Sequence, residues 1–214
     1  MAGIIITVAQ QKGGSGKTTI SAHLATALAY SGKSVAILDC DPQGSLGEWF
    51  EAREEALGED LTGLTFRTAS GWGARREARS LARTYDAIII DTPPKTDTEA
   101  RPAIEAADLV VMPVQPSPMD VWACGSTIDL AAKEKTPALL VLNRVPPRAA
   151  ITDDMAAALD GTGAPLANTR IGNRVGFAGA MKDGLTIMDT DKRGKGSAEM
   201  MALVAEVEKA VGIN

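Results

Sequence analysis

The sequence predicts a three-layer α/β protein, in which a mostly parallel β-sheet is covered by helices on both faces. Short apolar runs recur along the chain, and they carry hydrophobic residues on both faces, as buried parallel strands do. Longer amphipathic stretches separate these runs, which is the alternation of strand and helix that α/β folds require. The chain has 214 residues, of which 45% are hydrophobic and 23% charged, so it can bury a core as a single domain over 1–214.

Six runs are predicted to be strands, and helical patterns lie between them. The strands are GIIITVA (3–9), SVAILD (34–39), a weaker LTFRTA (64–69), DAIIID (86–91), DLVVMPV (108–114) and ALLVLN (138–143). Helices are predicted over 17–32, 74–85 and 150–161. The first has apolar residues at helical spacing and closes on Gly32, because glycine is a common helix stop.

The last stretch, SAEMMALVAEVEKAVGIN, is predicted to be an amphipathic helix packed on the domain. It carries one lysine, Lys209, against three glutamates, whereas a helix lying on a membrane is rich in basic residues. No apolar run approaches the roughly 20 residues of a bilayer span. The first apolar run is too short for a signal peptide and has no basic leader. We therefore expect a cytoplasmic protein without a membrane partner.

The stretch QKGGSGKTT (11–19) follows the first predicted strand and opens the first predicted helix, which is the setting of a phosphate-binding loop. Gly13, Gly14 and Gly16 would let backbone N–H groups turn toward phosphate oxygens at the helix N-terminus. Lys17 would neutralise the β and γ phosphates, and Thr18 would place its hydroxyl on Mg²⁺. The sequence therefore predicts a P-loop NTPase fold that binds a nucleotide. This stretch departs from the general sequence pattern of that loop, since Gln11 replaces a glycine and Lys12 is an additional lysine.

Three aspartates are predicted to lie at the same edge of the sheet. Asp39 and Asp91 end predicted strands, and Asp41 lies in the loop after the first of these. Ligands of open α/β sheets bind at the carboxyl ends of the strands, so these carboxylates should face the phosphate loop. Asp91 could hold Mg²⁺ through water, Asp39 is a further possible metal ligand, and Asp41 could reach an attacking water.

The segments QKGGSGKTT, LDCDPQGSLGEW and YDAIIIDTPP resemble the deviant Walker A, A′ and B motifs of the ParA/MinD family of ATPases, and the resemblance extends from residue 3 to about 145. The compact chain, which we expect to lack an N-terminal DNA-reading extension, is most similar to small ParA-type partition ATPases. The resemblance implies that Lys12 is a signature lysine that reaches the phosphates of a second subunit in an ATP-sandwich homodimer. It also implies that Asp41 activates water, that Thr18 and Asp91 hold Mg²⁺, and that Asn143 contacts adenine. The implied nucleotide-binding set is Lys12, Gly13, Gly14, Ser15, Gly16, Lys17, Thr18, Thr19 and Asn143.

Three functions are compatible with such an ATPase. The first is a partition ATPase, whose ATP dimer binds nonspecific DNA on the nucleoid and hydrolyses ATP when a ParB-like or other small partner protein stimulates it. The second is a MinD-like positioning ATPase at the membrane. The third is a synthetic or reductive enzyme on the same fold. An iron–sulfur version of the third would need cysteines in loops facing the dimer axis; Cys40 is poorly placed for this, whereas the position of Cys124 leaves it open. Otherwise both cysteines and His23 are expected to be packed side chains. The residues do not distinguish a plasmid, a chromosome, a protein cluster or an organelle as the cargo.

Two basic segments are candidates for binding a partner. Residues 168–195 have a net charge of +3 in a chain of net charge -5, and Arg170, Arg174 and Lys182 are the predicted DNA contacts. A dimer would double this patch, which suits binding to the phosphate backbone without base readout. The second segment has arginines at helical spacing, which could face DNA, a partner protein or water: Arg75, Arg76, Arg79 and Arg83. Either segment could instead be an ordinary solvated surface.

Overall fold

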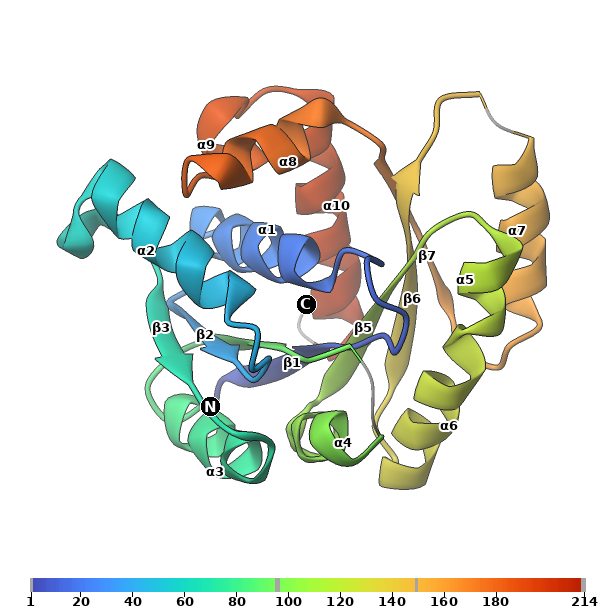
Figure 1. The fold of residues 1–214 in the computed structure, drawn as a ribbon, viewed down its shortest axis with the longest axis horizontal. Helices are drawn as coiled ribbons and strands as arrows, with labels where there is room; N and C mark the ends of the chain where they lie inside the picture. Colours follow the sequence, from blue (N-terminus) through green and yellow to red (C-terminus); the bar gives the residue numbers. More distant parts are fainter. Residues whose placement is uncertain (1, 95–96, 149, 213–214) are drawn as a thin grey trace.

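The computed structural model describes residues 2–94, 97–148 and 150–212. Within these ranges, one sheet of parallel strands forms the middle layer, in the order β3-β2-β4-β1-β5-β6-β7 (Figure 1). The strands are β1 (Ile4–Val8), β2 (Val35–Asp39), β3 (Thr65–Thr68), β4 (Ala87–Asp91), β5 (Leu109–Val114), β6 (Ala138–Val145) and β7 (Leu166–Gly172). Because these pairings are all parallel, the carboxyl ends of the strands share one edge.

Helices cover both faces of the sheet, which confirms the predicted three-layer α/β fold. The helices are α1 (Lys17–Tyr30), α2 (Ser45–Leu57), α3 (Gly71–Leu81), α4 (Asp97–Ala106), α5 (Pro118–Trp122), α6 (Cys124–Glu134), α7 (Ile151–Asp160), α8 (Val175–Lys182), α9 (Ile187–Thr190) and α10 (Lys195–Ala210), with a 3-10 turn at η1 (Glu59–Leu61). Helices α1, α2, α8, α9 and α10 share a core with one face of the sheet. Helices α3 to α7 cover the other face.

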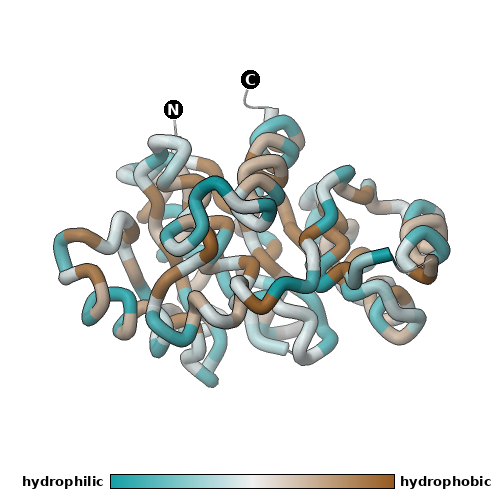
Figure 2. Tube along the Cα trace, turned by 90° about the horizontal axis from the view of Figure 1, so that it is seen from above, coloured by the Kyte–Doolittle hydropathy of each residue, from teal (hydrophilic) through white to brown (hydrophobic). Residues whose placement is uncertain are grey.

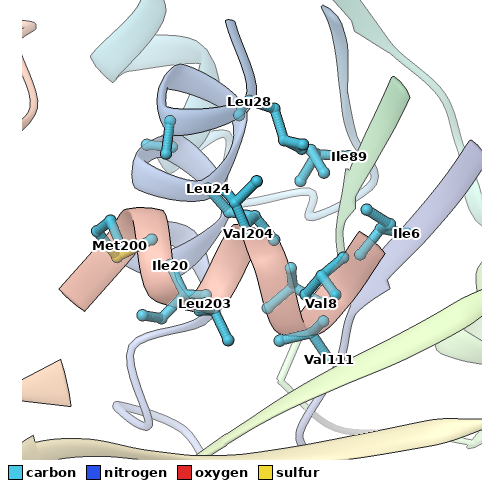
Figure 3. Close-up of a cluster of buried hydrophobic side chains, with 14 of the residues drawn as sticks. Ile6, Val8, Ile20, Leu24, Leu28, Ile89, Val111, Met200, Leu203 and Val204 are labelled. Carbon is cyan, nitrogen blue, oxygen red and sulfur yellow. The ribbon is translucent and has the colours of Figure 1, made fainter. Parts of the chain in front are cut away.

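The central strands are buried on both faces, as their unbroken apolar runs predict. In β4, Ile89 faces the layer of α1 and α10, whereas Ile88 and Ile90 face the layer of α3 and α4. Figure 3 shows side chains of β1, β4 and β5 meeting Leu24 of α1 and Val204 of α10. In Figure 2 the hydropathy alternates along the outer helices, because each presents one face to the core and the other to solvent. This packing fixes the strand ends and the start of α1 in place.

The predicted strands and helices are all present, with ends shifted by a few residues. Helix α3, for example, spans Gly71–Leu81 where 74–85 was expected, and the C-terminal helix starts at Lys195. Strand β7 was not predicted, because it is an edge strand with exposed Asn168 and Arg170 among its apolar residues. Several helices were also missed, the longest of them being α2.

His23 is a packed side chain, as expected. It is fully buried in α1, where its Nδ1 lies 2.8 Å from the Thr19 carbonyl and its Nε2 accepts the backbone N–H of Ile187 at 3.1 Å. Burial lowers the pKa of His23 to about 4, so the ring stays neutral and connects α1 to the start of α9.

Candidate functional site

The loop between β1 and α1 has the backbone conformation of a phosphate cradle. Gly14 and Gly16 have φ angles of 77° and 95°, in the left-handed region that favours glycine. A Cβ on Gly16 would also lie 2.5 Å from Nδ2 of Asn143. The loop therefore requires glycine at position 16 for both its conformation and its close packing. The first turn of α1 follows immediately, with Lys17 as its first residue.

Side chains at the C-terminal ends of β5 and β6 donate hydrogen bonds to the backbone of this loop. Asn143 donates from Nδ2 to the Ser15 carbonyl at 2.9 Å. Gln115 and Arg144 both donate to the Gly14 carbonyl, at 2.8 and 3.2 Å. These bonds satisfy the two loop carbonyls and attach the loop to the ends of β5 and β6. Asn143 is 4% exposed, so the structure gives it a role in supporting the loop, and its contact with adenine stays a prediction.

Thr18 and Asp91 meet at the carboxyl end of β4. The Thr18 hydroxyl donates to Oδ2 of Asp91 at 2.7 Å, and Ser21 donates to Oδ1 at 2.9 Å. Asp91 is fully buried, and this burial raises its pKa to about 7 despite the two hydroxyl donors. Burial likewise lowers the pKa of Lys17, while the Asp91 and Asp41 carboxylates act in the opposite direction. Lys17 and Asp91 are thus buried ionisable groups. An anionic ligand would compensate the positive charge of Lys17, and a bound cation would compensate the negative charge of Asp91.

This arrangement fits a magnesium ion bound together with phosphates. Mg²⁺ in nucleotide sites takes one or two protein oxygens and completes its shell with phosphate oxygens and water. Thr18 and Asp91 are such a pair, and a cation beside Asp91 would favour the ionised form that burial disfavours. The described residues contain no cluster of three or more His, Cys, Asp or Glu side chains able to hold a metal by themselves. Phosphate oxygens and water would therefore supply the remaining ligands.

Asp39 and Asp41 are placed differently although they are two residues apart. Asp39 is buried, and its two oxygens accept the backbone N–H groups of Asp41 at 2.9 Å and Gly47 at 3.2 Å. Burial raises the pKa of Asp39. These bonds give Asp39 a structural role in shaping the loop, and its metal role stays a prediction. Asp41 is half-buried, its side chain accepts the Gln43 N–H at 2.9 Å, and it lines a groove of about 810 Å³.

Lys12 forms an ion pair that sequence spacing did not predict. Its Nζ lies 2.5 Å from Oδ2 of Asp120 in α5, and Asp120 is 2% exposed. The Ser117 hydroxyl donates to the same carboxylate oxygen, and Asp120 Oδ1 has no hydrogen-bond partner among the described atoms. The lysine is thus held beside the loop by a residue 108 positions away. Ser117 and Pro118 form a recognisable helix start, as the N-cap and first residue of α5, but they do not indicate that Asp120 pairs with Lys12.

The folded structure places carboxylates beside two of the predicted DNA contacts, so this region carries less unpaired positive charge than the sequence suggests. Arg170 is 2.8 Å from Asp153 of α7, and Arg174 pairs with Glu199 of α10. The Glu199 contacts raise the pKa of Arg174. Two of the three predicted contacts are therefore neutralised by carboxylates from outside their own segment. Lys182 is exposed and has no ion-pair partner within the described residues.

Both cysteines are buried, as expected. Burial raises the pKa of Cys40 to about 12 and also raises that of Cys124. Neither thiol lies at the surface, where a cluster shared between subunits would need it.

Among the described residues, no helix combines the length and apolar character that crossing a bilayer demands.

A glycine cradle on a parallel sheet, with a buried lysine and a Thr–Asp pair at its end, defines a P-loop nucleotide-binding protein. Comparison with known proteins gives the family. Residues 6–187 match the model of the CobQ/CobB/MinD/ParA nucleotide binding domain, so the chain belongs to that family. This confirms the resemblance inferred from the Walker-type motifs.

Relatives within the family include positioning proteins. The chain is 30% identical over 201 residues to the maintenance of carboxysome distribution protein A of Halothiobacillus neapolitanus, covering 91% of each chain. A variant of Cyanothece McdA in complex with ATP has a TM-score of 0.79 at 18% identity, over 100% of this chain and 98% of that one. MinD of Pyrococcus horikoshii with Mg-ADP has a TM-score of 0.82 at 23% identity, over 98% and 97%. The two structural likenesses establish the shared fold.

Proposed function

We propose that this protein is a Mg²⁺-dependent ATPase of the ParA type, which positions a large cargo by cycling between monomer and ATP-bound homodimer. The observation that carries the proposal is the second lysine of the loop, Lys12, held by Asp120 beside a complete phosphate cradle. A single nucleotide needs only Lys17, so we assign the additional cation a function that would arise when a second subunit is present. The similarity to a carboxysome distribution protein and to structures with ATP and Mg-ADP supports this assignment.

The chain's own residues would divide the chemistry of hydrolysis. The N–H groups of residues 13 to 18 and the Lys17 ammonium would bind the phosphates. Thr18 and Asp91 would hold Mg²⁺, which would neutralise charge on the β and γ phosphates. Asp41 would orient a water molecule for attack on the γ phosphorus and accept its proton as the bond to ADP breaks. The products would be ADP and inorganic phosphate.

Dimerisation would require Lys12 to leave Asp120. In the proposed sandwich, Lys12 would approach the γ phosphate bound to the other subunit and stabilise charge there, as an arginine finger does. The α5 helix that holds Lys12 also exposes two large apolar side chains, Met119 and Trp122, which are 62% and 74% exposed. Exposed apolar groups beside a ligand site are typical of surfaces that a partner covers. They support self-association at this edge of the sheet.

We further propose that the ATP dimer binds nonspecific DNA, which would place it on the nucleoid of the cytoplasm, and that a small partner protein stimulates hydrolysis. Within 168–195, the basic residues that have no ion pair to the described part of the chain are Lys182, Lys192, Arg193 and Lys195. They lie at the end of α8 and around the start of α10. Their number is small, so tight binding would need the two copies that a dimer supplies.

The DNA proposal is tested by titrating random-sequence duplex with the protein and ATP, with ADP, and without nucleotide. We expect binding only with ATP, with a salt slope of about 0.9 per phosphate neutralised. Lys182→Glu/Arg193→Glu should abolish binding, while the matched double change Lys133→Glu/Lys209→Glu, at exposed lysines of α6 and α10, should leave it intact. DNA binding that is equal with and without ATP would overturn the dimer-dependent proposal.

Two other functions are distinguished by a parallel sedimentation assay with anionic vesicles. Sedimentation with anionic vesicles in place of DNA binding would favour a MinD-like membrane function. Against it, the apolar residues of α10, including Met200, Leu203 and Val204, are packed against α1 in the core (Figure 3). Binding to neither DNA nor vesicles would favour a synthetic or reductive enzyme. An iron–sulfur version of such an enzyme is disfavoured, because both cysteines are buried.

A further inference from the structure

Helix α3 presents a basic and aromatic face to solvent. Its inner face is formed by Ala74, Ala78 and Leu81, which are buried against the sheet and α4. The outward residues on the helix and just after it constitute what we call the α3 surface: Trp72, Arg75, Arg76, Arg79 and Arg83. Spacings of three and four residues place these side chains along one side of the helix. The predicted arginine stripe is therefore a real surface feature, and a tryptophan lies at one end of it.

The α3 surface is concave, and most of its positive charge has no ion-pair partner among the described residues. Its residues line a groove of about 600 Å³, in which Trp72 is 95% exposed. Arg75 pairs with Glu105 of α4 at 2.5 Å, whereas the other three arginines have no ion pair in the described part of the chain. A groove with one aromatic wall and unpaired guanidinium groups is suited to a ligand that has both apolar and anionic groups.

Trp72 also connects this groove to the candidate site. It lines the neighbouring groove of about 810 Å³ that contains Asp41 and Gln43. A molecule held on the α3 surface would consequently lie beside the loop that carries the proposed water-positioning residue. This adjacency gives the surface a means of influencing hydrolysis.

We propose that the α3 surface docks an acidic segment of a partner protein, with an apolar side chain of that segment on Trp72 and carboxylates opposite Arg76, Arg79 and Arg83. Tryptophan and arginine are among the residues most enriched at the energetic centres of protein interfaces. Carboxylates at chosen positions can match the three unpaired arginines through two-pronged hydrogen bonds.

A nucleic acid fits this surface less well than a peptide. Glu105 borders it, paired with Arg75, and Glu99 lines the adjoining groove next to Trp72. A phosphate backbone carries a charge at every nucleotide and would bring some of these against the two glutamates. A peptide can place uncharged residues there instead. The position of the carboxylates thus favours a protein partner.

The proposal can be tested without nucleotide, so that its outcome does not depend on the ATPase cycle. A phage library of random peptides, about twelve residues long and able to span the helix when extended, would be selected on the protein. We expect enriched sequences to combine Asp or Glu with Leu, Phe or Trp. By fluorescence anisotropy, synthetic versions should bind about tenfold more weakly to Arg79→Glu/Arg83→Glu and to Trp72→Ala.

The control is the double change Lys133→Glu/Lys209→Glu, which alters the net charge equally and should leave peptide binding unchanged. Circular dichroism and urea midpoints would verify that each variant is folded. Failure to enrich acidic peptides, or equal binding of them by Arg79→Glu/Arg83→Glu, would overturn the proposal. So would binding of a single-stranded oligonucleotide that Arg79→Glu/Arg83→Glu abolishes in the absence of peptide binding, because the surface would then serve nucleic acid.

Discussion

Replacing the buried carboxylate of Asp91 with an amide should stabilise the nucleotide-free protein at alkaline pH. Burial raises the pKa of Asp91 from 3.8 to about 7, a difference of about 3 pKa units. At about 1.4 kcal/mol per unit, ionising this carboxylate in the folded protein costs up to about 4 kcal/mol relative to the unfolded chain. Because the folded pKa is the higher one, stability falls as pH rises from 3.8 to 7, and the penalty is complete above pH 7.

The amide of Asp91→Asn cannot ionise, but it has only one oxygen to accept from Thr18 and Ser21. Losing one of these hydrogen bonds costs about 1 kcal/mol. The variant should therefore exceed the wild type by about 3 kcal/mol at pH 8, and by less than about 1 kcal/mol near pH 5, where only part of the ionisation penalty is present. Urea unfolding at both pH values, with a chelator present to remove Mg²⁺, measures the two differences.

The same variant should lose Mg²⁺-dependent hydrolysis, since the amide is a poorer ligand for the ion than a carboxylate. Stability and activity would thus change in opposite directions, as is common for buried charges at active sites. The reasoning is refuted if Asp91→Asn is less stable than the wild type at pH 8, or if the stability difference is the same at both pH values.

Three further predictions concern other parts of the site and the core. Asp41→Ala should bind ATP normally but hydrolyse it about 10²–10⁴-fold more slowly, and failure to bind nucleotide would instead make Asp41 structural. Asp120→Asn should weaken the hold on Lys12 and lower the ATP concentration needed for dimerisation in light scattering; an unchanged midpoint would contradict this. The buried His23 should cost about 3 kcal/mol of stability as pH falls from 6.5 toward 4, because only the unfolded chain is protonated there; His23→Gln should remove this slope in urea unfolding.

The parts of the site that depend on local sequence were predictable. The glycines, Lys17 and Thr18 form one loop, and the strand that ends at Asp91 places this carboxylate across from Thr18. This followed from the sequence because the apolar runs identify parallel strands, and parallel strands bring their carboxyl ends to one edge.

The contacts between distant segments were not predictable. Asp120 lies 108 residues from Lys12, and Asp153 and Glu199 neutralise Arg170 and Arg174 from other helices. A charge count over 168–195 cannot include carboxylates that tertiary packing brings in from elsewhere. The exposure of Trp72 was not predicted either, because the expected helix began at residue 74 and Trp72 lay outside it.

The most direct test of the proposed function is the ATP dependence of self-association in the wild type and in Lys12→Ala. Sedimentation velocity would be run with Mg²⁺ and a slowly hydrolysed ATP analogue, alongside phosphate release with ATP and binding of a fluorescent nucleotide. We predict that the wild type shifts from monomer to dimer, while Lys12→Ala binds nucleotide with similar affinity, stays monomeric and loses most hydrolysis. A Lys12→Ala protein that dimerises and hydrolyses ATP like the wild type would contradict the account.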